Sequence, residues 1–174
     1  MTSKKRLPKH LPAVLRVLGI ALLVIVIGLC APITLPRIAG FEIYEVVSGS
    51  MEPEIPVGSV LYVKPVEPKT VKENDIIAFR EVDDVVAHRV VTNRTGIGEF
   101  VTKGDANNVE DRDPISYDAV VGRVEMHLPV FGMAMALYSS VIGKVYLLLT
   151  AGCGLMLCML ANRMEDEQAA KSQP

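Results

Sequence analysis

The chain is poor in cysteine, and its middle has none. Its three cysteines, Cys30, Cys153 and Cys158, all lie in apolar stretches toward the two ends of the 174 residues. This excludes a disulfide framework in the middle of the chain. The spacing of Cys153 and Cys158 is not that of a metal site. We interpret all three as small apolar packing residues, because a cysteine outside disulfides behaves as a buried hydrophobe.

The middle of the chain also lacks an excess of basic residues. Residues 36–140 contain ten Lys and Arg but seventeen Asp and Glu, a balance of −7. A nucleic-acid-binding module needs a basic face, so this balance argues against nucleic acid as a partner. Residues 1–16 are the opposite: they carry five basic residues and no acidic one (Lys4, Lys5, Arg6, Lys9 and Arg16).

There is no tryptophan, and only 5% of the residues are aromatic although half are hydrophobic. The hydrophobic residues concentrate at the two ends. Val17 to Leu35 is an uncharged run of 19 residues, which as a helix spans ~28 Å, close to a bilayer's hydrocarbon core. We predict a transmembrane helix over residues 17–36, with Pro32 and Pro36 marking its outer end, where extended chain begins. A cleavable signal peptide is the alternative.

A second uncharged run covers Val145 to Ala161, 17 residues. It predicts a transmembrane helix over residues 141–161, which could begin as early as Met133 because a lysine near a helix end, here Lys144, can reach the membrane surface. A buried helix of a soluble protein is the alternative. The polar tail, residues 162–174, is expected to be disordered. The basic leader, residues 1–16, predicts that both termini are cytoplasmic and that residues 37–132 are extracytoplasmic.

The middle segment reads as mainly β. Short runs rich in Val, Ile and Tyr alternate with turn residues, and no helical period is seen between residues 41 and 126. Residues 81–84 and 93–98 are expected to form hairpin turns. Asn93-Arg94-Thr95 also matches a glycosylation acceptor pattern, but we favour a turn. The expected strands are Glu42–Val47, Ser59–Val63, Asp75–Arg80, Val85–Thr92, Glu99–Thr102 and Ala119–Met126.

Three polar motifs stand out in this segment. Ser50 follows a glycine in Ser48-Gly49-Ser50-Met51-Glu52-Pro53, a context for a serine on a tight turn. His88 is the one histidine well inside the segment, and a neutral imidazole can take a proton from a serine hydroxyl. The loop at 102–112 supplies Asp105 and Asp111, and a serine–histidine pair needs a carboxylate to orient the imidazole. Taken singly, each motif is more often a plain turn, a surface histidine or a solvated loop.

Together, the motifs resemble the type I signal peptidases, in the branch found in archaea, the endoplasmic reticulum and some Gram-positive bacteria. The resemblance covers roughly residues 17–126. It rests on Val47–Pro53, Ala87-His88-Arg89-Val90, Thr102-Lys103-Gly104-Asp105 and Val121-Gly122-Arg123-Val124, in family order and with similar spacing. It implies a β-rich catalytic domain flanked by two transmembrane helices.

The resemblance also implies roles. Ser50 matches the nucleophile and His88 the general base, where the common bacterial branch has a lysine. Asp111 matches the acid required beside the histidine, and Asp105 a second acid that supports the site. The oxyanion would be held by the backbone N–H of Ser50 and by the Ser48 hydroxyl. Asn74 stands where the family usually has glycine, which affects a turn rather than the chemistry.

The implied activity is a serine endopeptidase of the cell membrane that removes signal peptides from exported preproteins after small, alanine-like residues. Expected partners are the preproteins, the bilayer and the secretion translocon, and no cofactor is expected. One alternative is a specialised peptidase for a few surface, fimbrial or biofilm proteins. Others are an inactive relative and a metal hydrolase using His88, Asp105 and Asp111. No second histidine or cysteine lies near enough in sequence to favour a metal.

Overall fold

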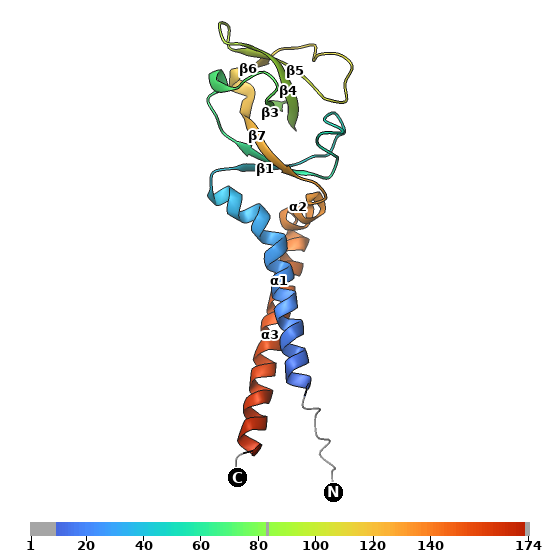
Figure 1. Cartoon of the computed structure of the whole chain (residues 1–174), viewed down its shortest axis with the longest axis vertical. Coiled ribbons are helices and arrows are strands. Elements are labelled where there is room, and N and C mark those ends of the chain that lie inside the picture. The colour runs from blue at the N-terminus through green and yellow to red at the C-terminus, as the bar shows by residue number, and fades with distance from the viewer. Residues whose placement is uncertain (1–9, 83, 173–174) are drawn as a thin grey trace. The chain divides into compact units, whose positions relative to one another are not determined.

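The computed structural model describes residues 10–82 and 84–172 (Figure 1). Two units are distinguished, one made of residues 32–136 and the other of residues 10–31 with 137–172. The elements in chain order are α1 (Leu11–Ile38), β1 (Glu42–Glu45), β2 (Val60–Lys64), η1 (Pro68–Thr70), β3 (Ile76–Glu81), β4 (Asp84–Arg94), β5 (Glu99–Lys103), β6 (Ile115–Ser116), η2 (Tyr117–Ala119), β7 (Val120–Leu128), α2 (Gly132–Ser139) and α3 (Val141–Ser172).

The first unit is built on one seven-stranded antiparallel sheet in the order β1-β2-β7-β3-β4-β5-β6. The predicted mainly β class, with long apolar helices on either side in sequence, is confirmed. All six predicted strands are present, with ends shifted by one or two residues. β6 was not predicted, because a two-residue strand is too short to show a period.

Both faces of the sheet are covered by apolar side chains, as the alternation along β3 shows. Ala78 belongs to a buried cluster, called here the first apolar cluster, with Met51, Ile55, Leu61 and Val63. Its neighbours Ile77 and Phe79 belong to the other cluster, with Val71, Val90 and Phe100. Successive strand residues point to opposite faces, so β3 contributes to both clusters and is fixed at the centre of the sheet.

The two predicted hairpin turns are found. Glu81 pairs with Asp84, so Val82 and residue 83 connect β3 to β4; residue 83 lies outside the described residues. The second turn covers residues 95–98. Asn93 lies in β4, where its side-chain amide donates to the carbonyl oxygen of Val71 at 2.7 Å and its Oδ1 accepts from the Tyr117 hydroxyl. These bonds occupy the amide nitrogen that glycosylation would use.

The predicted end of the first helix is wrong. α1 continues through Pro32 and Pro36 to Ile38. The helix is stopped by Gly40, which has φ +84°. The N–H of Phe41 donates to the carbonyl oxygen of Pro36, and the N–H of Gly40 donates to the carbonyl oxygen of Arg37. This is a Schellman motif, which needs a left-handed residue and so favours glycine. Gly40, not the prolines, therefore stops the helix.

The helix accommodates Pro36 because a side chain replaces the bond that proline cannot make. The N–H of residue 36 would bond the carbonyl oxygen of Pro32, but proline has no N–H. The hydroxyl of Tyr62, on β2, donates to that oxygen at 3.0 Å. Tyr62 is almost completely buried, and the bond ties the last turns of α1 to the sheet.

The second apolar segment forms two helices rather than one early-starting helix. α2 ends at Ser139 and α3 begins at Val141. Ser140 separates them, and its Oγ accepts the N–H of Gly143 at 2.9 Å, the bond of a helix N-cap.

The expectation of a disordered tail is wrong for the residues described. α3 continues to Ser172. Residues 162–172 are rich in Glu, Gln, Ala and other good helix formers. Arg163 also lies 3.9 Å from Glu167 one turn later, a pair of the kind that supports isolated helices. The polarity of the tail was therefore no reason to expect disorder.

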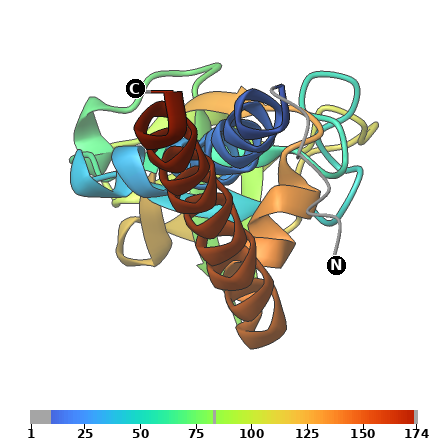
Figure 2. The ribbon, with the colours of Figure 1, turned by 90° about the horizontal axis from the view of Figure 1, so that it is seen from below.

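α1 and α3 are long and apolar enough to cross a membrane, over Leu11–Ile38 and Val141–Ala170. Within the second unit they lie side by side, antiparallel (Figure 2). A Cβ on Gly19 would lie 2.6 Å from Sγ of Cys158 and 2.7 Å from the carbonyl oxygen of Gly154. The backbones approach this closely because both helices have a glycine at the contact.

Candidate functional site

Ser50 begins a turn that follows β1, and two buried residues hold that turn. Met51 and Ile55 are inserted into the first apolar cluster, and the N–H of Ile55 donates to the carbonyl oxygen of Met51 at 2.9 Å. The carbonyl oxygen of Ser50 accepts the N–H of Ala106 at 2.9 Å. The turn is therefore anchored to the core on one side and to the 104–112 loop on the other. Ser48 precedes it and is exposed.

His88 lies in the middle of β4, paired with Ile77 of β3. Its ring is buried and packs edge-on against Phe79, with ring centroids 6.0 Å apart. By strand alternation it shares a face of the sheet with Val90. A ring packed in this way has little freedom to rotate, so the direction of its two nitrogens is fixed by the strand.

Asp111 is the carboxylate that contacts His88. Its Oδ2 lies 2.6 Å from Nδ1 of the imidazole. The same oxygen accepts the hydroxyl of Thr102, on β5, at 2.7 Å, and the N–H of Asp111 donates to the carbonyl oxygen of Thr102 at 2.9 Å. An acceptor at Nδ1 fixes the tautomer that leaves Nε2 able to take a proton.

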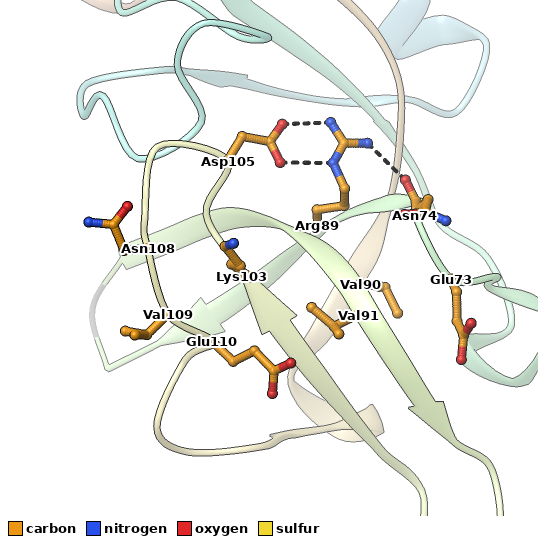
Figure 3. Close-up of a pocket in the computed structure, with 10 residues that line it drawn as sticks. All are labelled: Glu73, Asn74, Arg89, Val90, Val91, Lys103, Asp105, Asn108, Val109 and Glu110. Atoms are coloured by element: carbon orange, nitrogen blue, oxygen red, sulfur yellow. Dashed lines mark hydrogen bonds and ion pairs between the residues drawn. The ribbon is translucent and has the colours of Figure 1, made fainter.

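Asp105 has a different partner, Arg89, the residue after His88. The guanidinium donates to Oδ1 and Oδ2 of Asp105 at 2.8 and 2.6 Å, and to the carbonyl oxygen of Asn74 at 2.9 Å (Figure 3). The hydrogen bond to Asp105 raises the pKa of Arg89 above its ordinary value. Since consecutive residues of β4 face opposite ways, the two acids of the loop are divided between the two faces.

Asn74 forms the turn where the related family usually has glycine. Its φ is +72°, in the left-handed region that asparagine tolerates better than most residues. Its carbonyl oxygen accepts from Arg89. The substitution therefore leaves the turn in place and keeps that turn in contact with the Arg89–Asp105 pair.

Gly104 is the point where the serine turn and the histidine meet. A Cβ at this residue would lie 2.6 Å from the carbonyl oxygen of Ser50 and 3.1 Å from Nε2 of His88. It would also lie 2.8 Å from Nδ2 of Asn107. The Ser50 carbonyl oxygen and Nε2 of His88 therefore both lie against residue 104, and only a glycine fits between them. Among the predicted site residues, the Ser50 backbone lies on one side of Gly104 and Nε2 of His88 on the other, Asp111 contacts Nδ1 of that histidine, and Asp105 pairs with Arg89.

An open hollow of about 740 Å³ lies beside the Arg89–Asp105 pair. Lys103 and Glu110 line it, together with Glu73 and Val91 (Figure 3). Arg89 and Lys103, which both line the hollow, are paired in the β4–β5 ladder. Within residues 10–82 and 84–172, no cluster of three or more His, Cys, Asp or Glu side chains could hold a metal ion.

Sequence reasoning missed Thr102 and Arg89. Both lie inside the motifs that carry the family resemblance, but their side chains were given no role. The alternation of β4 could have separated Arg89 from His88, because adjacent strand residues cannot serve the same face. Nothing in the sequence pointed to Thr102, since a buried threonine in a strand is ordinary.

Comparison with known proteins supports the motif resemblance. No protein-family model matches the chain. Signal peptidase I W of Bacillus subtilis is 38% identical over 90 residues, which cover 49% of this chain and 47% of that protein. The signal peptidase complex catalytic subunit SEC11C of Homo sapiens is 34% identical over 100 residues, 51% of this chain and 52% of that protein. The chain spans about half the length of the curated relatives it matches. These similarities confirm that it resembles the type I signal peptidases.

Proposed function

We propose that the protein is a signal peptidase, a membrane-bound serine endopeptidase that removes N-terminal signal peptides from exported preproteins. The observation that carries the proposal is that the Ser50 backbone and Nε2 of His88 both lie beside Gly104, while Asp111 contacts Nδ1 of His88 at 2.6 Å. The similarity to signal peptidases and the two long apolar helices support it.

In the proposed mechanism, the Ser50 hydroxyl attacks the carbonyl carbon of the scissile peptide bond and Nε2 of His88 takes the hydroxyl proton. Asp111 stabilises the resulting imidazolium through Nδ1. His88 then gives the proton to the leaving amine, which frees the mature protein and leaves the signal peptide as an ester on Ser50. A water molecule, deprotonated by His88, hydrolyses the ester and restores the Ser50 hydroxyl.

The negative charge on the substrate oxygen needs donors that are already in place. We assign this role to the backbone N–H of Ser50 and to the hydroxyl of Ser48. Ser48 is exposed on the bend that leads into the Ser50 turn, so an incoming peptide can reach its side chain. The bend lies directly before Met51, so both donors belong to a segment that the first apolar cluster holds through Met51.

The proposed substrates are preproteins with small, alanine-like residues at the first and third positions before the cut, as the family resemblance implies. An extended peptide can add to a sheet as a further strand, with pockets for alternate side chains. β1 is an edge strand, paired with β2 alone, and it leads into the Ser50 turn. A membrane-inserted signal peptide and the secretion translocon are the corresponding partners in the bilayer.

The decisive experiment compares the purified protein with its Ser50→Ala variant on a signal-peptide-bearing precursor. We expect Ser50→Ala to abolish cleavage, because loss of the nucleophile leaves only the small rate that binding and oxyanion contacts supply. Ser116→Ala removes an exposed serine hydroxyl elsewhere in the sheet and should cleave normally. Near-normal processing by Ser50→Ala would contradict the assignment. A panel of unrelated precursors then separates a general peptidase from a specialised one.

A further inference from the structure

Thr102 contacts the candidate site from inside the protein. Its side chain is fully buried in β5, and its hydroxyl donates to Oδ2 of Asp111 at 2.7 Å. Oδ2 is also the oxygen that lies 2.6 Å from Nδ1 of His88. One carboxylate oxygen therefore receives two hydrogen bonds, one from the imidazole and one from Thr102.

Three other serine and threonine hydroxyl groups of the chain are satisfied differently. Thr70 donates to the carbonyl oxygen of Glu67 at 2.7 Å, Thr150 to that of Tyr146 at 2.8 Å, and Ser59 to that of Pro56 at 2.6 Å. These are local bonds to backbone carbonyl oxygens, which serine and threonine hydroxyls commonly make. Thr102 instead bonds a charged side chain nine residues further along the chain. Hydrogen bonds to ionised groups are roughly twice as strong as neutral ones.

Asp111 needs such a bond because it lies in the 104–112 loop, outside any strand. Its backbone is held by its N–H bond to the Thr102 carbonyl oxygen at 2.9 Å, but that bond leaves the side chain free to turn about its Cα–Cβ and Cβ–Cγ bonds. The Thr102 hydroxyl fixes the carboxylate as well. Thr102 thus holds Asp111 at two points, and its position in the β4–β5 ladder opposite Val90 places it on the face that His88 occupies.

We propose that Thr102 is a positioning residue, which holds the carboxylate of Asp111 against His88 and acts on the reaction only through that contact. The role in catalysis rests on the function proposed above. The role in orienting Asp111 does not, and it can be measured without any turnover.

The kinetic test replaces Thr102 by valine, which has nearly the same shape but no hydroxyl. We expect kcat to fall roughly 10- to 100-fold, the worth of one hydrogen bond to a charged group, with KM unchanged because Thr102 is buried away from the substrate. Thr102→Ser keeps the hydroxyl and should restore most of the rate. Tyr117→Phe is the matched control: it deletes another partly buried hydroxyl, bonded to Asn93, and should leave kcat unchanged.

The second test follows the His88 Nδ1–H proton by NMR in the full-length Ser50→Ala protein, labelled with ¹⁵N-histidine in detergent. We expect a far-downfield resonance from the Nδ1–H···Oδ2 bond, retained in Thr102→Ser and lost or shifted upfield in Thr102→Val. If Thr102→Val does not fold, Thr102→Ala replaces it and is compared with Thr102→Ser, since both lack the methyl group.

The two tests separate the two proposals. If the wild-type protein cleaves no precursor, the proposed function fails, and the resonance still decides the role of Thr102. The positioning role is overturned if the valine variant keeps the His88 resonance unchanged, or if it keeps the wild-type kcat. A serine variant as impaired as valine would also overturn it, because the hydroxyl would then not be the group that matters.

Discussion

The two aspartates of the 104–112 loop are only six residues apart, yet their surroundings differ in a way that bears on their roles. Asp111 contacts the imidazole of His88 and the hydroxyl of Thr102. Asp105 makes a two-pronged ion pair with Arg89, which also holds the Asn74 turn. A carboxylate at Nδ1 of a histidine bears on proton transfer, whereas a carboxylate on an arginine that clamps two segments bears on structure.

We therefore predict different outcomes for Asp111→Asn and Asp105→Asn. Asp111→Asn should lose about 10⁴ in turnover with little change in melting temperature, because an amide can hold the wrong tautomer of the imidazole. Asp105→Asn should lower stability by about 1–3 kcal/mol, the worth of hydrogen bonds to a charged group, and should reduce activity through the displaced loop. Cleavage rate and thermal melting of each purified variant are the measurements.

Arg89→Gln provides the control for the structural role, because it removes the partner of Asp105 without touching the loop. It should reproduce the loss of melting temperature seen for Asp105→Asn, and the double variant should cost little more than either single one. If Asp105→Asn stayed folded and inactive while Asp111→Asn stayed active, the two roles would have to be exchanged.

Among the helices, the last turns of α1 depend most clearly on a contact with the sheet. Pro36 leaves the carbonyl oxygen of Pro32 without its helical donor, and the buried hydroxyl of Tyr62 supplies the missing bond. Burial also raises the pKa of Tyr62, so the hydroxyl keeps its proton and remains a donor throughout the neutral range. A helix with two prolines can thus continue past Pro32 to Ile38, where the Gly40 motif stops it.

Tyr62→Phe tests this contact. We expect the variant to lose about 1–3 kcal/mol of stability, because the Pro32 carbonyl is left without a donor, with a drop in melting temperature of the order of 4–8 °C for each kcal/mol. Tyr44→Phe is the matched control on the neighbouring strand β1, where the hydroxyl bonds Glu42 at the surface; it should change stability little. Equal losses in the two variants would show that the bond to Pro32 is not special.

The strands could be predicted because their information is local. Runs rich in Val, Ile and Tyr between turn residues gave β2, β3 and β4 to within two residues at each end, and turn residues gave both hairpins. The candidate site residues Ser50, His88 and Asp111 were likewise identified from short motifs. None of this required knowledge of which strands are neighbours.

The parts that were missed depend on contacts between distant segments. Whether Pro36 ends a helix depends on Tyr62, 26 positions later, and whether Asp111 is oriented depends on a buried threonine in β5. Ser140 is the exception, since a serine before an apolar run is a recognised N-cap signal. It could have excluded the earlier start near Met133 and supported the predicted start at residue 141 without any structure.

The arrangement of α1 and α3 has a consequence for the whole chain. Arg16, at the start of α1, bonds Asn162 at 3.1 Å and pairs with Glu165, both near the end of α3. Gly19 also lies against Gly154 and Cys158. The helices are therefore antiparallel, and the N-terminal end of α1 lies beside the C-terminal end of α3. If both cross the bilayer, the segments before Leu11 and after Ala170 emerge on the same side, and the segment between the helices emerges on the other.

We predict that this shared side is the cytoplasm, because five basic residues precede Val17 and basic residues near a membrane span are retained inside. The test introduces one cysteine at a time, after replacing the three native ones, and labels intact cells with a membrane-impermeant maleimide. Ile97→Cys, in the exposed turn between β4 and β5, should be labelled from outside. Asp166→Cys, on the exposed last turns of α3, should be labelled only after lysis, and its labelling in intact cells would contradict the topology. Cleavage of exported preproteins requires Ser50 on the outer side. If Asp166→Cys were labelled in intact cells and Ile97→Cys only after lysis, the result would therefore also argue against the proposed function.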